Sequence, residues 1–147
     1  MSYQIELSYK KNDKFSDFLK NKIVDFNNTH SKHHAESRKE GSVQPIIMMV
    51  SDDRHHWIGG ITAEVYWNWV KIHYFWIAES YRAKGLGSQL LAKTEGAAID
   101  LGAEKALLTT YEFQARTFYE EHGFQVVGEV KDYPPGSSYF TMVKELI

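Results

Sequence analysis

The stretch WIAESYRAKGLGSQLLAKTEGAA, residues 76–98, carries the strongest local signal in this sequence of 147 residues. It opens with the apolar end of a strand and continues, from Leu86, as a helix-forming sequence. Between the two stands Arg82-Ala83-Lys84-Gly85-Leu86-Gly87, with two cations and two glycines. The first N–H groups of a helix lack internal partners, and glycines let a ligand approach the backbone closely. The join therefore predicts a site for a phosphate-bearing ligand.

A family resemblance, rather than the motif alone, indicates which phosphate-bearing ligand this is. There is no Gly-Lys-Ser/Thr ending of a P-loop and no third glycine of a dinucleotide fingerprint. Arg-x-x-Gly-x-Gly after an apolar strand instead resembles the acetyl-CoA pyrophosphate motif of the GNAT family of N-acetyltransferases. Further on, Ala115-x-x-x-Tyr119-x-x-x-Gly123-Phe124 is similar to the family's second signature. The chain thus looks like a small GNAT protein of bacterial type.

Hydrophobic periodicity predicts a single α+β domain over residues 1–147, and the order of its elements resembles the GNAT order. The resemblance implies the GNAT acyl-CoA N-acyltransferase fold, a central mixed, mostly antiparallel sheet flanked by helices. Strands are predicted at 3–9, 45–52, 57–67, 70–78, 105–111, 124–130 and 139–146, and helices at 14–27, 86–101 and 114–123.

The N-terminal part combines a clear helix with a segment that the pattern does not assign. Asp13 is predicted to cap a helix in which Phe15, Phe18, Leu19, Ile23 and Phe26 recur at helical spacing. Residues 28–43 are polar, and both a second short helix and a mobile loop over a site fit them.

The resemblance also implies where acetyl-CoA, the expected co-substrate, is bound. In the family, the coenzyme lies where two strands splay apart, here residues 70–78 and 104–111. The backbone of Ile77 is expected to hydrogen-bond the pantetheine arm as an added strand would. The amides of Ala83, Lys84, Gly85, Leu86, Gly87 and Ser88 are expected to hold the pyrophosphate, with the Arg82 side chain beside them.

Tyr119 is the candidate general acid that the second signature implies. When the tetrahedral intermediate collapses, a coenzyme A thiolate leaves, and a nearby phenol can protonate or stabilise it. A tyrosine packed on the core side of its helix is the alternative. A phenylalanine such as the neighbouring Phe118 would pack equally well. The presence of a hydroxyl at residue 119 therefore favours the catalytic role.

Three side chains compete for the role of general base. In some relatives a histidine nine residues before the motif's first position serves, and His73 has this spacing from Arg82. Period-two alternation predicts that His73 lies on the same face as Phe75. Glu64, on the preceding strand, is a rival that would act through a water molecule, and Glu79 is a third candidate.

The acceptor amine is the least determined part of the prediction. Tyr66, Trp67 and Trp69 sit at a predicted hairpin and are candidates for an aromatic wall around a cationic or ring-bearing amine. Polyamines, amino acids, antibiotics and protein or peptide amines all remain possible acceptors. Many family members carry Asn where this chain has Glu112, so the coenzyme contacts of that Asn are not transferred to this chain.

The composition of the chain limits the possible reaction mechanisms and binding partners. The absence of cysteine excludes disulfides and a cysteine nucleophile, so direct transfer in a ternary complex is favoured. The net charge of −2 favours neither nucleic acid nor an anionic membrane as a partner. His30 and His34 share a helical face, but no metal site is predicted. We expect a complete cytoplasmic protein, with a homodimer possible. A non-catalytic acyl-CoA sensor on the same fold is the alternative function.

Overall fold

The computed structural model describes all 147 residues, which form two compact units, residues 1–39 and 40–147. No helix in the chain is both long enough and apolar enough to cross a bilayer.

The N-terminal unit consists of two helices, α1 (Asp13–His30) and α2 (Lys32–Ser37). The side chain of Asn12, not Asp13, caps α1 and accepts the N–H of Phe15 at 3.0 Å. Ser31 ends α1 through its own N–H and caps α2 by accepting the N–H of His34. The polar segment that the sequence left open therefore contains a second short helix.

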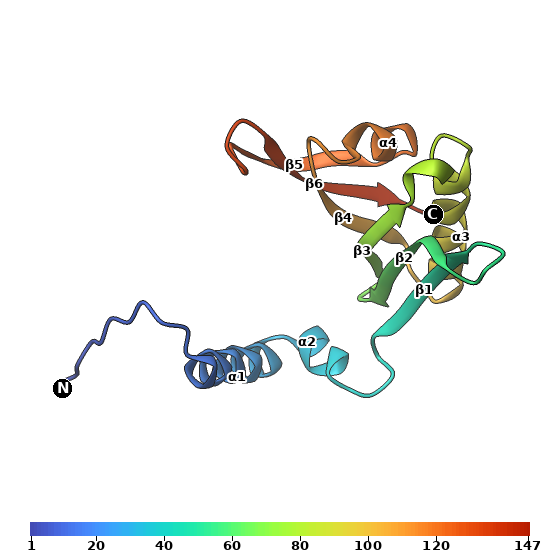
Figure 1. The fold of residues 1–147 in the computed structure, drawn as a ribbon. Coiled ribbons are helices and arrows are strands. Elements are labelled where there is room, and N and C mark those ends of the chain that lie inside the picture. Colours follow the sequence, from blue (N-terminus) through green and yellow to red (C-terminus); the bar gives the residue numbers. More distant parts are fainter. The chain divides into compact units, whose positions relative to one another are not determined.

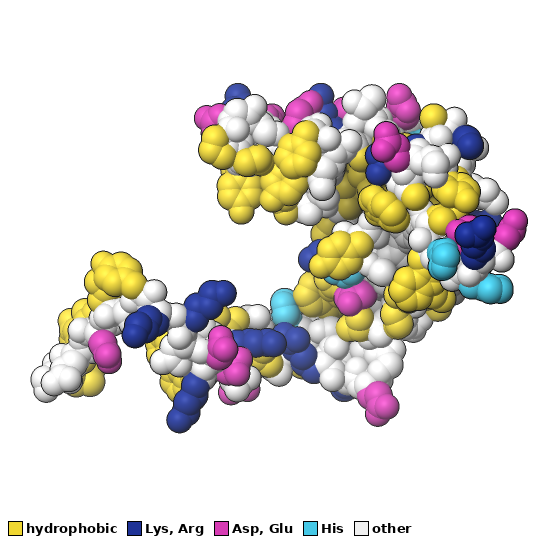
Figure 2. Space-filling model, in the orientation of Figure 1, with side chains coloured by type: hydrophobic (Ala, Val, Ile, Leu, Met, Phe, Trp, Pro, Cys, Tyr) yellow, Lys and Arg dark blue, Asp and Glu magenta, His cyan; other side chains and the backbone are white.

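The strand predicted in this unit is absent. Residues 1–8 have no regular secondary structure, although a strand was predicted at 3–9. An alternating segment becomes a strand only where a neighbouring strand pairs with its backbone, and this unit has none. In addition, α1 has no buried residue. The apolar positions that recur at helical spacing are all exposed: Phe15, Phe18, Leu19, Ile23 and Phe26. Figure 2 shows apolar side chains on the surface of this unit.

The second unit is built on a six-stranded sheet of order β1-β2-β3-β4-β6-β5 (Figure 1). Its strands are β1 (Gln44–Ser51), β2 (Trp57–Tyr66), β3 (Trp69–Ile77), β4 (Lys105–Tyr111), β5 (Gln125–Lys131) and β6 (Ser138–Glu145). Only β3 and β4 run parallel; all other neighbours are antiparallel. The predicted mixed, mostly antiparallel sheet is confirmed.

Helices connect and cover this sheet. The crossover between β3 and β4 contains a short 3-10 helix, η1 (Glu79–Tyr81), and then α3 (Leu86–Asp100); α4 (Arg116–Glu121) follows β4. Helix α3 buries Leu90, Leu91 and Ala98 against the sheet. Its end is set by Gly102, whose φ of +96° is a left-handed conformation that glycine adopts readily. The core thus fixes α3, and with it the turn at which α3 begins.

Strands β3 and β4 separate soon after they meet. They pair only from Trp69 to Lys71 with Lys105 to Leu107, and β3 then continues as far as Ile77. The last six residues of β3 therefore have no hydrogen-bonded neighbour on the β4 side. This opening lies at the carboxyl end of a strand in a parallel pair, where ligands of α/β folds commonly bind.

Candidate active site

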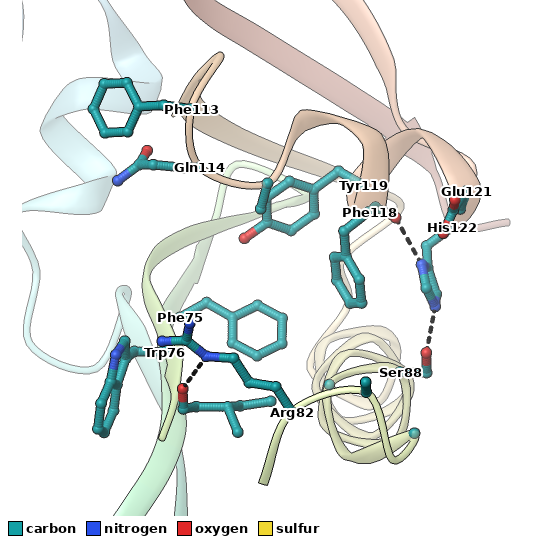
Figure 3. A pocket seen from close by; sticks show the side chains of 15 residues that line it. Phe75, Trp76, Arg82, Ser88, Phe113, Gln114, Phe118, Tyr119, Glu121 and His122 are labelled. Carbon is teal, nitrogen blue, oxygen red and sulfur yellow. Dashed lines mark hydrogen bonds between the residues drawn. The ribbon is translucent and has the colours of Figure 1, made fainter. Parts of the chain in front are cut away.

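A cavity of about 610 Å³ occupies the opening between β3 and the start of α4 (Figure 3). Three segments contribute its walls: the end of β3, the turn before α3, and the chain around α4. The lining residues are Phe75, Trp76 and Ile77; Arg82, Ala83, Gly85, Gly87 and Ser88; and Phe113, Gln114, Ala115, Phe118, Tyr119, Glu121 and His122. One cavity therefore joins both sequence motifs.

The turn before α3 presents main-chain N–H groups to this cavity. Gly85 is the residue at the N-cap position of α3, and its φ of +81° is left-handed. Because glycine has no side chain, the N–H groups of the first turn receive no side-chain cap. The helical hydrogen bonds begin only with Gln89, whose N–H donates to the carbonyl of Gly85 at 3.1 Å. The N–H groups of the preceding turn are thus available to an anionic ligand. Ala83 also has a positive φ, +59°, a conformation uncommon for a residue with a side chain.

Gly87 has a packing role that the sequence did not reveal. A Cβ atom at this position would lie 3.3 Å from the Cδ1 of Ile77 and 3.4 Å from the ring of Phe118. The missing side chain therefore lets α3, β3 and α4 approach one another at the floor of the cavity. The amides of Lys84 and Leu86 were also predicted to hold the pyrophosphate, but neither residue lines the cavity.

Ile77 turns its backbone polar groups toward the open side of β3. Ala78 donates its N–H to the carbonyl of Ile58 at 2.7 Å, so Ile77 lies in a non-hydrogen-bonded pair with Gly59 of β2. Its own N–H and carbonyl therefore point away from β2. The carbonyl accepts the Nε–H of Arg82 at 2.7 Å, which fixes that guanidinium at the cavity wall.

The second signature builds α4 and directs one hydroxyl into the cavity. Tyr119 is buried and packs between Phe75, Phe118 and Phe124, at centroid distances of 6.3, 5.4 and 5.6 Å. Gly123, with φ of +91°, ends the helix. Figure 3 shows the Tyr119 hydroxyl on the cavity side of the ring. Burial raises the pKa of Tyr119 to about 12, so the phenol stays protonated at neutral pH.

His73 lies on a different face from the one predicted. Thr62 pairs with Tyr74 and Ala63 with Ile72, which leaves His73 as the extra residue of a β-bulge. The bulge interrupts the alternation, so His73 does not share a face with Phe75, which pairs with the buried Ile61.

The bulge brings together two residues that the sequence offered as rival bases. The Nε2 of His73 lies 3.5 Å from the Oε2 of Glu64, and both side chains are partly exposed. Neither lines the cavity. Glu79 begins η1 and is exposed, and its carbonyl accepts the N–H of Arg82.

The aromatic residues predicted for the acceptor lie at the other end of β3. Trp67 and Asn68 have positive φ and form the hairpin turn between Tyr66 and Trp69. Trp69 is eight residues from Ile77, about 26 Å along a strand. The aromatic rings that line the cavity are instead those of Trp76 and Phe113, besides Phe75, Phe118 and Tyr119.

The structure also adds residues that sequence reasoning did not assign to the site. Phe113 and Gln114 directly precede the second signature and His122 lies within it, so proximity to that signature was the available signal. Gln114 is held in place by accepting the N–H of Tyr111 at 2.9 Å. Glu112 lies outside the cavity lining and forms an ion pair with Arg116 at 3.4 Å.

This arrangement, with a splayed parallel strand pair, an uncapped helix start and a buried tyrosine in one cavity, is that of an acyl-coenzyme A-dependent acyltransferase. Residues 12–124 match the family model described as the acetyltransferase (GNAT) family, and the chain belongs to this family.

Individual relatives agree with that assignment. Over 95 residues, 64% of this chain and 70% of the relative, the sequence is 35% identical to the Blasticidin-S acetyltransferase of Streptomyces morookaense. An acetyltransferase from Bacillus cereus ATCC 14579 has a similar structure, with a TM-score of 0.82 and 28% identity over 95% of this chain and 97% of that one. A Bacillus anthracis protein solved with acetyl coenzyme A shares the fold, with a TM-score of 0.60 and 22% identity over 77% of this chain and 67% of that one.

Proposed function

We propose that this acetyltransferase moves the acetyl group from acetyl-CoA directly to an amine, with both substrates bound at once. The observation that carries the proposal is the single cavity that runs from the uncapped start of α3, past the open edge of Ile77, to the hydroxyl of Tyr119. The family match begins at residue 12, in the N-terminal unit, which supports a single N-acetyltransferase domain.

Coenzyme binding would use the backbone more than side chains. The N–H groups from Ala83 to Ser88 and the guanidinium of Arg82 would hold the pyrophosphate. The pantetheine arm would then lie beside β3, where the outward N–H of Ile77 can donate to one of its amides as a neighbouring strand would. This path leads the thioester from the start of α3 toward Tyr119.

Tyr119 would act on the leaving group. The amine attacks the thioester carbonyl, a C–N bond forms, and the C–S bond breaks to release the coenzyme A thiolate. Because the pKa of Tyr119 is raised to about 12, its phenol remains a hydrogen-bond donor to the sulfur throughout the neutral range. Because this pKa is high, Tyr119 would stabilise the thiolate by the hydrogen bond rather than transfer its proton completely to the sulfur.

The acceptor amine must lose a proton before it attacks, and the pair of Glu64 and His73 is the proposed receiver. Their separation of 3.5 Å lets a carboxylate and an imidazole act together. Glu64 would attract a cationic acceptor, and His73 would accept the proton through a water molecule, because neither side chain lines the cavity.

We further propose a small antibiotic amine as the acceptor, because the relative from Streptomyces morookaense is a Blasticidin-S acetyltransferase. Trp76 and Phe113, at the cavity, are better placed to stack on a ring or cation than the hairpin aromatics Tyr66, Trp67 and Trp69. A hairpin contact would require an acceptor that reaches along most of β3.

Release of free coenzyme A, followed across a panel of amines, tests the proposal. The panel should contain blasticidin S, aminoglycosides, polyamines, amino acids and peptides, with acetyl-CoA as donor. We expect turnover with at least one antibiotic amine. Tight coenzyme binding with no turnover on any amine would contradict the proposal and support the non-catalytic sensor. Transfer confined to peptides or polyamines would contradict only the acceptor class.

A further inference from the structure

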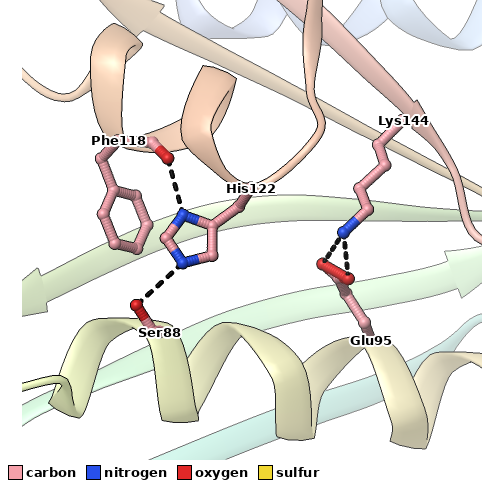
Figure 4. Close-up of polar contacts among 5 residues, drawn as sticks. All are labelled: Ser88, Glu95, Phe118, His122 and Lys144. Carbon is pink, nitrogen blue, oxygen red and sulfur yellow. Dashed lines mark hydrogen bonds and ion pairs between the residues drawn. The ribbon is translucent and has the colours of Figure 1, made fainter.

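His122 connects the two helices that build the proposed coenzyme site (Figure 4). It follows α4 directly, and its ring packs on Phe118 at a centroid distance of 4.4 Å. Its Nδ1 lies 2.8 Å from the carbonyl oxygen of Phe118, and its Nε2 lies 2.8 Å from the Oγ of Ser88, in the first turn of α3. Both Ser88 and His122 line the cavity.

The partner of Nδ1 determines how the ring is protonated. A carbonyl oxygen only accepts hydrogen bonds, so Nδ1 must carry a hydrogen in every protonation state that keeps this contact. In the neutral ring, Nε2 is then an acceptor, and Ser88 must donate its hydroxyl hydrogen to it. The hydroxyl hydrogen of Ser88 is therefore turned away from any ligand in the cavity while His122 is neutral.

Protonation of the ring reverses the contact between His122 and Ser88. Nε2 then donates to the Oγ of Ser88, and the Ser88 hydroxyl hydrogen is released for a phosphate oxygen. The charged ring also adds a positive charge one side chain away from the bound anion. An anion at the start of α3 is thus better bound by the protonated form of His122 than by the neutral form.

We propose that His122 is a positioning residue for the coenzyme pyrophosphate, that it acts through the Ser88 hydroxyl, and that coenzyme binding takes up a proton at this ring. This inference rests on the proposed function, since it requires the pyrophosphate to bind at the start of α3. It also gives α4, which bears Tyr119, a direct connection to the turn that holds the coenzyme.

Other charged groups around His122 do not replace it in this role. Arg82 and Glu121 line the same cavity. Glu95, two helical turns beyond Ser88 on α3, is paired with Lys144 of β6 at 2.6 Å (Figure 4). On α4, Glu120 is paired with Arg116 at 3.3 Å. Among these groups, only His122 belongs to a residue type that ordinarily titrates near neutral pH.

Isothermal titration of coenzyme A in buffers of different ionisation enthalpy measures the proton uptake. We expect the wild-type protein to take up a fraction of a proton per coenzyme bound, and to bind about tenfold more tightly near pH 6 than near pH 8. In His122→Gln, both effects should be lost. The matched control is His56→Gln, in the turn after β1 and paired with Asp52, which should behave as the wild type.

The ligand's own 3′-phosphate also titrates in this range, so the same titrations are repeated with 3′-dephospho-coenzyme A. Ser88→Ala keeps the ring but removes the hydroxyl, so it should reduce the pH dependence that His122→Gln abolishes. Unchanged proton uptake in either variant, or none in the wild type, would overturn the inference. If the wild-type protein does not bind coenzyme A at all, the proposed function itself fails.

Discussion

Aromatic residues lie at both ends of β3, but the two ends differ in what their backbone groups can bind. At the Trp69 end, β3 pairs with β2 on one side and with β4 on the other, and a hairpin closes it. At the Ile77 end, the β4 side is open and a cavity begins. Unpaired main-chain donors, rather than the density of rings, thus distinguish the site from the rest of the strand.

The largest contrast is expected between Tyr119, which lines the cavity, and Tyr66, at the hairpin end of β3. Tyr119→Phe removes the hydroxyl at the cavity and should lower kcat by about 100-fold, with little change in coenzyme affinity, because the phenol is proposed to act on the leaving thiolate. Tyr66→Phe, at the hairpin end, should leave kcat unchanged. Steady-state kinetics with the best acceptor and calorimetry with coenzyme A measure both. Equal rates for Tyr119→Phe and wild type would remove Tyr119 from the mechanism.

Two neighbouring cations offer a second contrast. Arg82 is fixed at the cavity wall by the carbonyl of Ile77, whereas Lys84 does not line the cavity. Arg82→Ala should weaken coenzyme A binding by about tenfold, the effect of one charge-assisted hydrogen bond. Lys84→Ala is the matched control and should weaken it by less than about threefold. A larger loss of coenzyme A affinity in Lys84→Ala than in Arg82→Ala would indicate that the pyrophosphate binds at a different part of the turn.

The two tryptophans of β3 test where the acceptor lies. Trp76→Ala should raise the KM for a ring-bearing or cationic acceptor by about fivefold, since stacking on an exposed ring contributes modestly. Trp69→Ala should leave that KM unchanged, although it removes the contact of Lys105 with the ring at 5.5 Å. If only the hairpin variant raised KM, the acceptor would extend along β3, as the sequence suggested.

The smallest effect concerns alkaline pH. The pKa of Tyr119 is raised by burial from 10.0 to about 12, so the fold favours the protonated phenol. The stability this provides is fully present below pH 10 and is lost as pH rises through about 12. Thermal unfolding between these values should therefore show a steeper loss in the wild type than in Tyr119→Phe. Parallel curves would mean that the phenol is not buried as described.

The sheet and the glycine-containing turn before α3 could be predicted because their signals are local. Apolar runs fix the strands from residue 44 onward, and Gly85 and Gly102 mark where α3 begins and ends. The second signature likewise located α4, and GNAT membership agrees with both motifs.

The errors arose where structure depends on distant partners. The alternation at residues 3–9 predicts a strand only if another strand pairs with it. The face of His73 depends on a bulge set by the register of two strands, which no spacing within one strand reveals. The contact of His122 with Ser88 joins residues 34 positions apart and was invisible for the same reason.

A structure of the protein with acetyl-CoA tests the central claim most directly. The account predicts the pyrophosphate at the start of α3, within hydrogen-bond distance of N–H groups between Ala83 and Ser88, and the pantetheine arm beside the N–H of Ile77. A coenzyme bound elsewhere, with these donors satisfied by the protein itself, would contradict it.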